Sequence, residues 1–265
     1  MKYLALAFGI CLVCSTMGFI RIVYFVGLGY AASIAAQAVC AAALYSATLA
    51  GWPIIQVSLL LAYGIRLGSY LTLRNLDRGY QAREVSQGTK RGQTGAVAKV
   101  GIWIGVAALY VLLALPTFLT LSAQAGGVPL GSLPTGITLM ALGLGLESVA
   151  DWQKFRFKAA HPTRFCNTGL YRIVRCPNYL GEMLFWIGLW FSATSAYQGW
   201  LERGLCTLGL ACILGIMIGA TRRLEREQAD HYAADLGYAT YRKTVPVLLP
   251  FLPLYSLRAL GGGRP

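Results

Sequence analysis

Charged residues are scarce in this sequence, and acidic residues are the scarcest. Only 12% of the 265 residues are charged, against about 25% in soluble globular domains. The chain holds 10 Asp and Glu residues, and none of them precedes Asp77. Hydrophobic residues make up 56% of the chain, above the roughly 45–50% of soluble domains. This composition excludes an ordinary water-soluble fold.

Several motifs of soluble enzymes are also missing. No Gly-x-Gly-x-x-Gly follows a predicted strand and no Walker-type loop occurs, which excludes a Rossmann or P-loop domain. The Gly-x-Ser-x-Gly of many hydrolases is absent as well. The two histidines, His161 and His231, lie far apart in the chain, so no metal site is predicted. No groove-reading motif occurs either, so nucleic acid is not an expected partner.

What the chain has instead is a series of long apolar runs separated by short turns. Several runs approach or exceed the about 20 residues that cross a bilayer. They predict an all-α fold, a polytopic membrane helix bundle that forms a single membrane domain over residues 1–265. The seven transmembrane helices are expected at about residues 3–20, 23–49, 54–74, 98–123, 129–149, 179–198 and 203–221, and a cytoplasmic tail at 222–265.

The distribution of Lys and Arg predicts the orientation of these spans. Basic residues concentrate in the loops 74–99 and 150–178 and in the tail, and such residues are retained in the cytoplasm. The amino terminus is therefore expected outside and the carboxyl terminus inside, as in a multi-pass protein of a bacterial-type inner membrane. The net charge of +13 then faces the cytoplasm, where it favours anionic lipid heads or a phosphate-bearing cofactor. The polar segment 75–97 is expected to be a flexible cytoplasmic loop, which either orders over a ligand or serves only as a connector.

Polar residues near or inside the spans recur at helical spacing in four stripes. Their members are Arg66, Tyr70 and Arg74; Glu147 and Asp151; Asn178 and Glu182; and Arg223, Glu227 and His231. Polar groups are costly in hydrocarbon, so such stripes predict a functional site. All four fall at predicted cytoplasmic helix ends, and we expect them to converge on one polar cavity. The alternative is that helix ends are polar in any membrane protein and that Arg66 extends to the interface.

Two of these residues, Glu147 and Glu182, stand inside otherwise apolar runs. An unpaired carboxylate is costly there, so basic partners are expected for both. The candidates are Arg164, Arg172 and Arg223.

The stretch from Asn167 to Glu182 reads Asn-Thr-Gly-Leu-Tyr-Arg-Ile-Val-Arg-Cys-Pro-Asn-Tyr-Leu-Gly-Glu. It closely resembles the steroid 5α-reductase family, including its bacterial relatives. Further motifs extend the resemblance over about 147–251: Asp151-Trp-Gln-Lys, Arg223-x-x-x-Glu227, and Tyr238-x-x-Tyr241-Arg242 with Pro246 and Pro250. The motif Arg66-x-x-x-Tyr70-x-x-x-Arg74 adds a weaker match, and residues 1–60 add little.

This resemblance implies NADPH-dependent reduction of the C4–C5 double bond of a 3-keto-4-ene steroid within a membrane cavity. Its implied partners are a steroid-like lipid and the surrounding membrane lipids, with no obligate protein partner. The residues that it implies for the NADPH site are Arg74, Asp151, Arg164, Tyr171, Arg172, Asn178, Glu182, Arg223, Glu227 and His231. Glu147 stands where eukaryotic relatives often carry Asn, and His231 where they carry Tyr.

The resemblance also implies a catalytic tyrosine. Tyr70 resembles the family's tyrosine that hydrogen-bonds the substrate 3-ketone. The family pairs this tyrosine with a glutamate of the second span, but no acidic residue precedes Asp77 here. Gln37, at about the matching distance upstream, is the predicted catalytic substitute, and Gln56 is its rival.

Two other functions remain open at this stage. Membrane isoprenylcysteine and phospholipid methyltransferases, which use S-adenosylmethionine, share the Arg-x-Pro-x-Tyr-x-Gly-Glu pattern. Their motif usually begins Arg-His-Pro, whereas this chain has Arg175-Cys176-Pro177, which favours the reductases. The second alternative is a non-enzymatic lipid-binding or transport protein.

Overall fold

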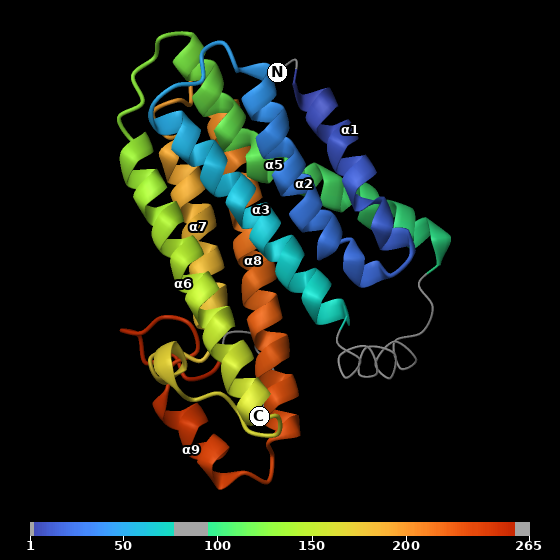
Figure 1. Ribbon diagram of the computed structural model, residues 1–265, viewed down its shortest axis with the longest axis vertical. Helices are drawn as coiled ribbons and strands as arrows, with labels where there is room; N and C mark the ends of the chain where they lie inside the picture. The colour runs from blue at the N-terminus through green and yellow to red at the C-terminus, as the bar shows by residue number, and fades with distance from the viewer. Residues whose placement is uncertain (1–2, 77–94, 258–265) are drawn as a thin grey trace. The chain divides into compact units, whose positions relative to one another are not determined.

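The structure is a computed structural model that describes residues 3–76 and 95–257 (Figure 1). Within these ranges every regular element is helical, which confirms the predicted all-α class. The helices are α1 (Leu4–Ser15), α2 (Leu28–Leu44), α3 (Trp52–Leu76), α5 (Ala96–Ala125), α6 (Leu133–Ala160), α7 (Pro177–Ser192), α8 (Trp200–His231) and α9 (Leu236–Thr244). Short 3-10 turns lie at Thr16–Phe19, Ile22–Tyr24 and Gly169–Arg172.

Five apolar segments are long enough to cross a membrane, and they make the chain a multi-pass membrane protein by length and composition. They are Ile22–Leu44, Trp52–Leu76, Ala96–Ala125, Leu133–Ala160 and Trp200–His231. The first predicted span corresponds to a shorter apolar helical segment, Leu4–Phe19. The sixth corresponds to α7, which has 16 residues.

Several helix ends differ from the predicted spans. The predicted span 129–149 is a helix from Leu133 to Ala160, and the predicted span 203–221 runs from Trp200 to His231. Hydropathy marks where the apolar surface ends, whereas Glu, Lys, Arg, Gln and Ala extend a helix readily into water. The predicted tail 222–265 therefore begins as a continuation of α8. Conversely, α2 starts only at Leu28, after the 3-10 turn and Gly27.

Most of the predicted loop 75–97 lies outside the described residues, since residues 77–94 are not among them. The described chain separates into two compact units. The first comprises Met1–Ile137 and Leu189–Gly209, and the second comprises Thr138–Gly188 and Leu210–Pro265. The helices α6, α7 and α8 contribute residues to both. That the whole chain forms one membrane domain stays a prediction.

The first unit packs α2 and α3 side by side in opposite directions (Figure 1). Small residues allow this close approach, as is common between membrane helices. A Cβ atom at Gly64 would lie 2.8 Å from the carbonyl oxygen of Ala31 and from the amide nitrogen of Ala35. Glycine is therefore required at this helix crossing. Helix α5 joins the pair, and its Tyr110 hydroxyl donates to the carbonyl of Phe25 at 2.6 Å.

In the second unit α6 and α7 meet at a pair of glycines. A Cβ atom at Gly143 would lie 2.5 Å from the backbone nitrogen of Phe185, and one at Gly181 would lie 2.6 Å from that of Glu147. Both distances are well below van der Waals contact, so neither position accepts a larger residue without separating the helices. This crossing brings Glu147 beside the first turns of α7.

Candidate functional site

The predicted site residues divide between the two units. Gln37, Tyr70 and Arg74 belong to the first unit. The second unit holds Asp151, Arg164, Tyr171, Arg172, Asn178, Glu182, Arg223, Glu227 and His231. That the two groups share one cavity stays a prediction.

Helices α6 and α7 bury acidic and amide side chains in the second unit. Glu147 is 4% exposed on α6, and Glu182 is 7% exposed on α7. Asp151 is half-buried one turn after Glu147, and Asn178 is half-buried one turn before Glu182. We call these four residues the α6–α7 polar group. The expectation that basic residues partner both glutamates stays a prediction.

Asn178 carries an unused acceptor within this group. Its Oδ1 atom is enclosed and accepts no hydrogen bond from any residue that the structure describes. Asn178 is the second residue of α7, and Pro177 ahead of it suits the first turn because its missing N–H would have no helical partner. An enclosed amide oxygen without a donor costs free energy, so a ligand that donates a hydrogen bond fits this position.

A buried ion pair anchors the chain just ahead of α7. Arg175 Nη2 lies 3.2 Å from Glu225 Oε1, and each side chain is only 2% exposed. Arg175 also donates from Nε to the carbonyl of Val245 at 3.2 Å and from Nη2 to the carbonyl of Tyr255. Glu225 Oε2 accepts from the backbone N–H of Leu257 at 3.2 Å. Both charges are therefore paired and hydrogen-bonded, which a buried pair requires.

Main-chain hydrogen bonds strengthen the same attachment. The N–H groups of Arg175 and Cys176 donate to the carbonyls of Pro246 and Val247 at 2.9 and 3.0 Å. The side chain of Cys176 packs with Val247, Leu248 and Leu257. The C-terminal segment 245–257 is thus tied across the residues that lead into α7 (Figure 1). This attachment holds the start of the helix that carries Asn178 and Glu182.

The segment between α6 and α7 is held in a similar way. Gln153 Oε1 accepts from the N–H of Leu170 at 2.9 Å, and the Tyr241 hydroxyl donates to the carbonyl of Tyr171 at 2.6 Å. Burial raises the pKa of Tyr241 and of Tyr238, and it raises the pKa of the Cys176 thiol to about 11. At neutral pH these groups are uncharged. They act by packing and hydrogen bonding rather than as nucleophiles.

The remaining predicted residues of the second unit, apart from buried Tyr171, are solvent-exposed. They are Arg164, Arg172, Arg223, Glu227 and His231. Arg223 Nε lies 3.8 Å from Glu227 Oε1, with the two side chains 58% and 49% exposed. Exposed guanidinium groups keep their donors accessible to phosphate. Among the described residues of the second unit, the buried Arg175–Glu225 pair is one that the sequence reasoning missed.

A sequence signal for Glu225 did exist. The buried face of α8 runs through Ile213, Met217, Thr221 and Glu225 at intervals of four. The spacing of polar residues instead selects Arg223, Glu227 and His231, because the apolar part of α8 is hydrophobic on all sides and does not show which face packs. The continuation of the buried face into the charged segment would have identified Glu225.

In the first unit the predicted pairing of Gln37 with Tyr70 requires correction. The hydroxyls of Tyr30 on α2 and Tyr63 on α3 lie 3.0 Å apart. Because α2 and α3 are antiparallel, moving seven residues along α2 from Tyr30 to Gln37 corresponds to moving from Tyr63 back to Gln56 on α3. Gln37 is therefore offset from Tyr70 by 14 residues of helix, or about 21 Å along the axis. Gln56 lies equally far from Tyr70 along α3.

The register thus separates both glutamines from Tyr70, while the catalytic role of Tyr70 by itself stays a prediction. Tyr70 is half-buried, and the guanidinium of Arg74 lies 5.8 Å from the centre of its ring, within the range of a cation–π contact. Tyr63 stands two turns earlier on the same face of α3 and is fully buried. Its seven-residue spacing from Tyr70 is the signal that could have identified it.

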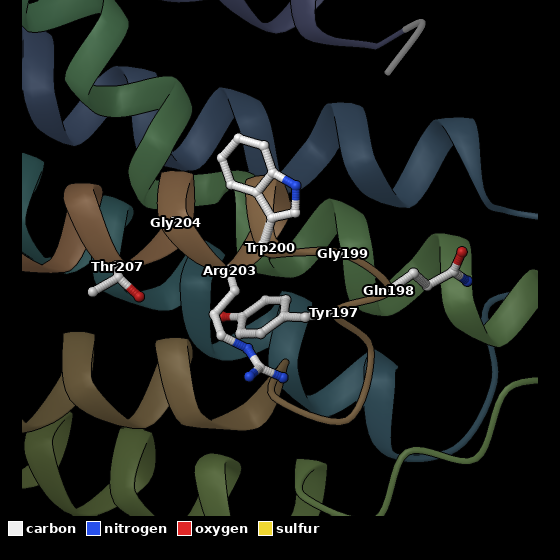
Figure 2. Close-up of a pocket in the computed structure, with 7 residues that line it drawn as sticks. All are labelled: Tyr197, Gln198, Gly199, Trp200, Arg203, Gly204 and Thr207. Atoms are coloured by element: carbon white, nitrogen blue, oxygen red, sulfur yellow. The ribbon is translucent and has the colours of Figure 1, made fainter.

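A separate pocket of about 510 Å³ lies at the turn between α7 and α8, within the first unit. Figure 2 shows the Arg203 side chain beside the Tyr197 ring, whereas Trp200 and Gln198 point away from them. Among the described residues that line this pocket, Arg203 and the Tyr197 phenol are the ionisable groups. The Tyr197 hydroxyl donates to the carbonyl of Trp190. None of the predicted site residues lines this pocket, and it lacks an acid–base pair.

Comparison with known protein families gives one match, which spans most of the chain. A family model described as "Protein of unknown function (DUF1295)" matches residues 13–245. The chain belongs to the DUF1295 family. Neither a curated protein nor a solved structure matches it. The matched residues of this DUF1295 chain include the α6–α7 polar group, the Arg175–Glu225 pair and the Tyr30–Tyr63 pair, so the function must be argued from these sites.

The buried Arg175–Glu225 pair of this DUF1295 chain is expected to contribute strongly to stability. Arg175→Met or Glu225→Gln alone should destabilise the protein by about 3–5 kcal/mol, because a buried charge loses its partner. Arg223→Met or Glu227→Gln, in the exposed pair of the same unit, should cost only about 0–1 kcal/mol. Thermal unfolding in detergent measures both effects. Equal melting temperatures for the two sets of variants would contradict the role of the Arg175–Glu225 pair.

Proposed function

We propose that this DUF1295 chain is an NADPH-dependent reductase that saturates the C4–C5 double bond of 3-keto-4-ene steroids. The observation that carries the proposal is the α6–α7 polar group. It lies in the segment that resembles the steroid 5α-reductases, and it combines buried carboxyls with the unused amide oxygen of Asn178.

The chemistry of these residues fits a nicotinamide nucleotide. Asn178 Oδ1 can accept a hydrogen bond from the carboxamide of the nicotinamide, and the carboxylates of the group can accept from ribose hydroxyls, as acidic residues do in other dinucleotide sites. The exposed Arg164, Arg172 and Arg223 can bind the phosphates. When bound, NADPH supplies the hydride.

The substrate half of the proposal lies in the first unit. Hydride addition at C5 moves an electron pair onto the oxygen of the 3-ketone, and a proton then adds at C4 to restore the ketone. A donor aimed at that oxygen, in a site free of water, stabilises the developing enolate. Tyr63 is the first candidate for this donor, because its side chain is fully buried and its hydroxyl lies 3.0 Å from that of Tyr30, which can accept or donate. Tyr70 is the second candidate on the same helix face.

The proposed topology has seven spans, with the amino terminus outside and the carboxyl terminus in the cytoplasm. The short helices α1 and α7 complete the count, since the apolar sequence after α7 continues as far as Tyr197. Lys and Arg in the cytoplasmic loops support this orientation. A reporter fused to the carboxyl terminus should be active only inside the cell. Activity only outside would overturn the topology.

The cofactor assignment is tested at Asn178. Asn178→Leu should weaken NADPH binding about tenfold or more, because the carboxamide of the nicotinamide loses its acceptor. Gln198→Leu, which changes an exposed amide at the α7–α8 turn, should leave NADPH affinity unchanged. Fluorescence titration of the purified protein measures both. Binding of S-adenosylmethionine with no binding of NADPH would refute the reductase and support the methyltransferase.

The ketone donor is tested by comparing two phenylalanine variants. If Tyr63 is the donor, Tyr63→Phe should lower kcat by about 10²–10³, the usual loss when one donor to a developing oxyanion is removed. Tyr70→Phe should then have a much smaller effect. NADPH affinity should be unaffected in both, since neither hydroxyl is assigned to the cofactor. Reduction of progesterone with NADPH is the assay, and a large loss in Tyr70→Phe alone would return the role to Tyr70.

A further inference from the structure

Two fully buried amides of the first unit have no role in the reaction described above. Gln37 on α2 and Gln56 on α3 are both 0% exposed. Gln37 Nε2 donates to the carbonyl of Tyr110 at 2.9 Å, and Gln56 Nε2 donates to Ser192 Oγ at 2.6 Å. The hydroxyl of Ser192 donates in turn to the carbonyl of Leu189 at 2.6 Å, so it can only accept from Gln56.

These contacts fix the orientation of both amides. The partner of Gln37 is a carbonyl oxygen, and the partner of Gln56 is a hydroxyl that already donates its proton. Both partners can only accept, so the NH₂ group of each glutamine must face its partner. The Oε1 atoms of Gln37 and Gln56 are left as acceptors. Both are enclosed, and neither accepts a hydrogen bond from the residues that the structure describes. Hydrocarbon supplies no water to satisfy them, so their orientation favours a ligand that donates.

The register of α2 and α3 places these acceptors relative to the tyrosine pair. Gln37 follows Tyr30 by seven residues and Gln56 precedes Tyr63 by seven, which is two helical turns in the same direction along the antiparallel pair. Seven residues return to almost the same helix face. Both amides therefore lie on the faces that hold the tyrosines, about 10 Å along the axis from them. That separation is close to the length of a fused four-ring carbon skeleton.

We propose that Gln37 and Gln56 form the binding site for a hydroxyl group at the far end of the substrate. The site then selects 3-keto-4-ene steroids that carry a 17-hydroxyl over those that carry a 17-ketone. A ketone oxygen brings no proton and cannot satisfy either acceptor oxygen, whereas a hydroxyl can donate to one of them. The inference rests on the proposed function, and it gives Gln37 a role in specificity instead of one beside Tyr70.

The test compares two steroids that differ only at C17, a 17β-hydroxyl and a 17-ketone. The full-length protein in detergent should show a kcat/KM at least about tenfold higher for the hydroxyl compound, because a site built for a hydrogen bond rejects an analogue that cannot make it. The same preference should appear in steroid affinity without turnover, measured by displacement of a labelled 17-hydroxysteroid. In Gln37→Met and Gln56→Met, which nearly conserve volume, both ratios should fall toward one.

Gln124→Met is the matched control. Gln124 is also an amide of the first unit whose NH₂ donates to a backbone carbonyl, that of Ala50 at 2.8 Å, and whose Oε1 accepts no hydrogen bond from the described residues. It differs in its place, since it lies at the end of α5, away from the tyrosine pair. Both ratios should keep their wild-type values in this variant. Its melting temperature and those of the two test variants show whether any change reflects folding.

The outcomes separate the two proposals. Binding that prefers the hydroxyl and depends on Gln37 and Gln56, without reduction of either steroid, would refute the reductase and keep this site. Reduction of both steroids with equal kcat/KM and equal affinity would keep the reductase and overturn the site, as expected if the amides hold only a trapped water. A preference that survives in both glutamine variants would also overturn it.

Discussion

Hydrocarbon cannot solvate a polar group, and this constraint decides where the polar side chains of the chain lie. In water an unpaired amide or carboxylate costs little, but inside a membrane each one must find a partner in the protein or in a ligand. Buried charges at the ends of the helices meet the same requirement: Arg175 and Glu225 pair with each other, and Arg175 Nε and Nη2 and Glu225 Oε2 also bond to backbone groups. Among the enclosed atoms that find no hydrogen-bond partner in the described residues are the oxygens of Gln37, Gln56 and Asn178, which carry the two proposals. These exceptions are where ligands are expected.

In the first unit the register of α2 and α3 decides which polar side chains lie at the same level of the two helices. The hydrogen bond between Tyr30 and Tyr63, together with the close approach at Gly64, determines which residues of the two helices face each other. Polar residues at seven-residue intervals then fall at matched levels, the glutamines at one and the tyrosines at the next. Such an arrangement fits a rigid lipid with a polar atom at each end and an apolar body between them.

In the second unit the position of the polar side chains depends on how the C-terminal segment is bonded to the start of α7. Asn178 and Glu182 can act together only if the first turns of α7 keep their position against α6. The glycine crossing at Gly143 and Gly181 brings the two helices close, and the Arg175–Glu225 pair holds the segment that leads into α7. A residue that touches no ligand thus contributes to the site by fixing the helix that does.

By itself the sequence determined the helical class and the apolar spans, because hydropathy and composition are local properties. It also pointed to Glu147 and Glu182 as candidates for the site, since a carboxyl inside an apolar run is costly without a partner. Only the tertiary structure decided which residues meet across helices. The number of residues between Gln37 and Tyr70 is compatible with a pair. In antiparallel helices, however, residue numbers rise along one helix while they fall along the other, so Gln37 lies at the level of Gln56 and not of Tyr70. Likewise Glu225, not Glu227, became the buried acid of α8, because the buried face of a helix is chosen by neighbours that are distant in sequence.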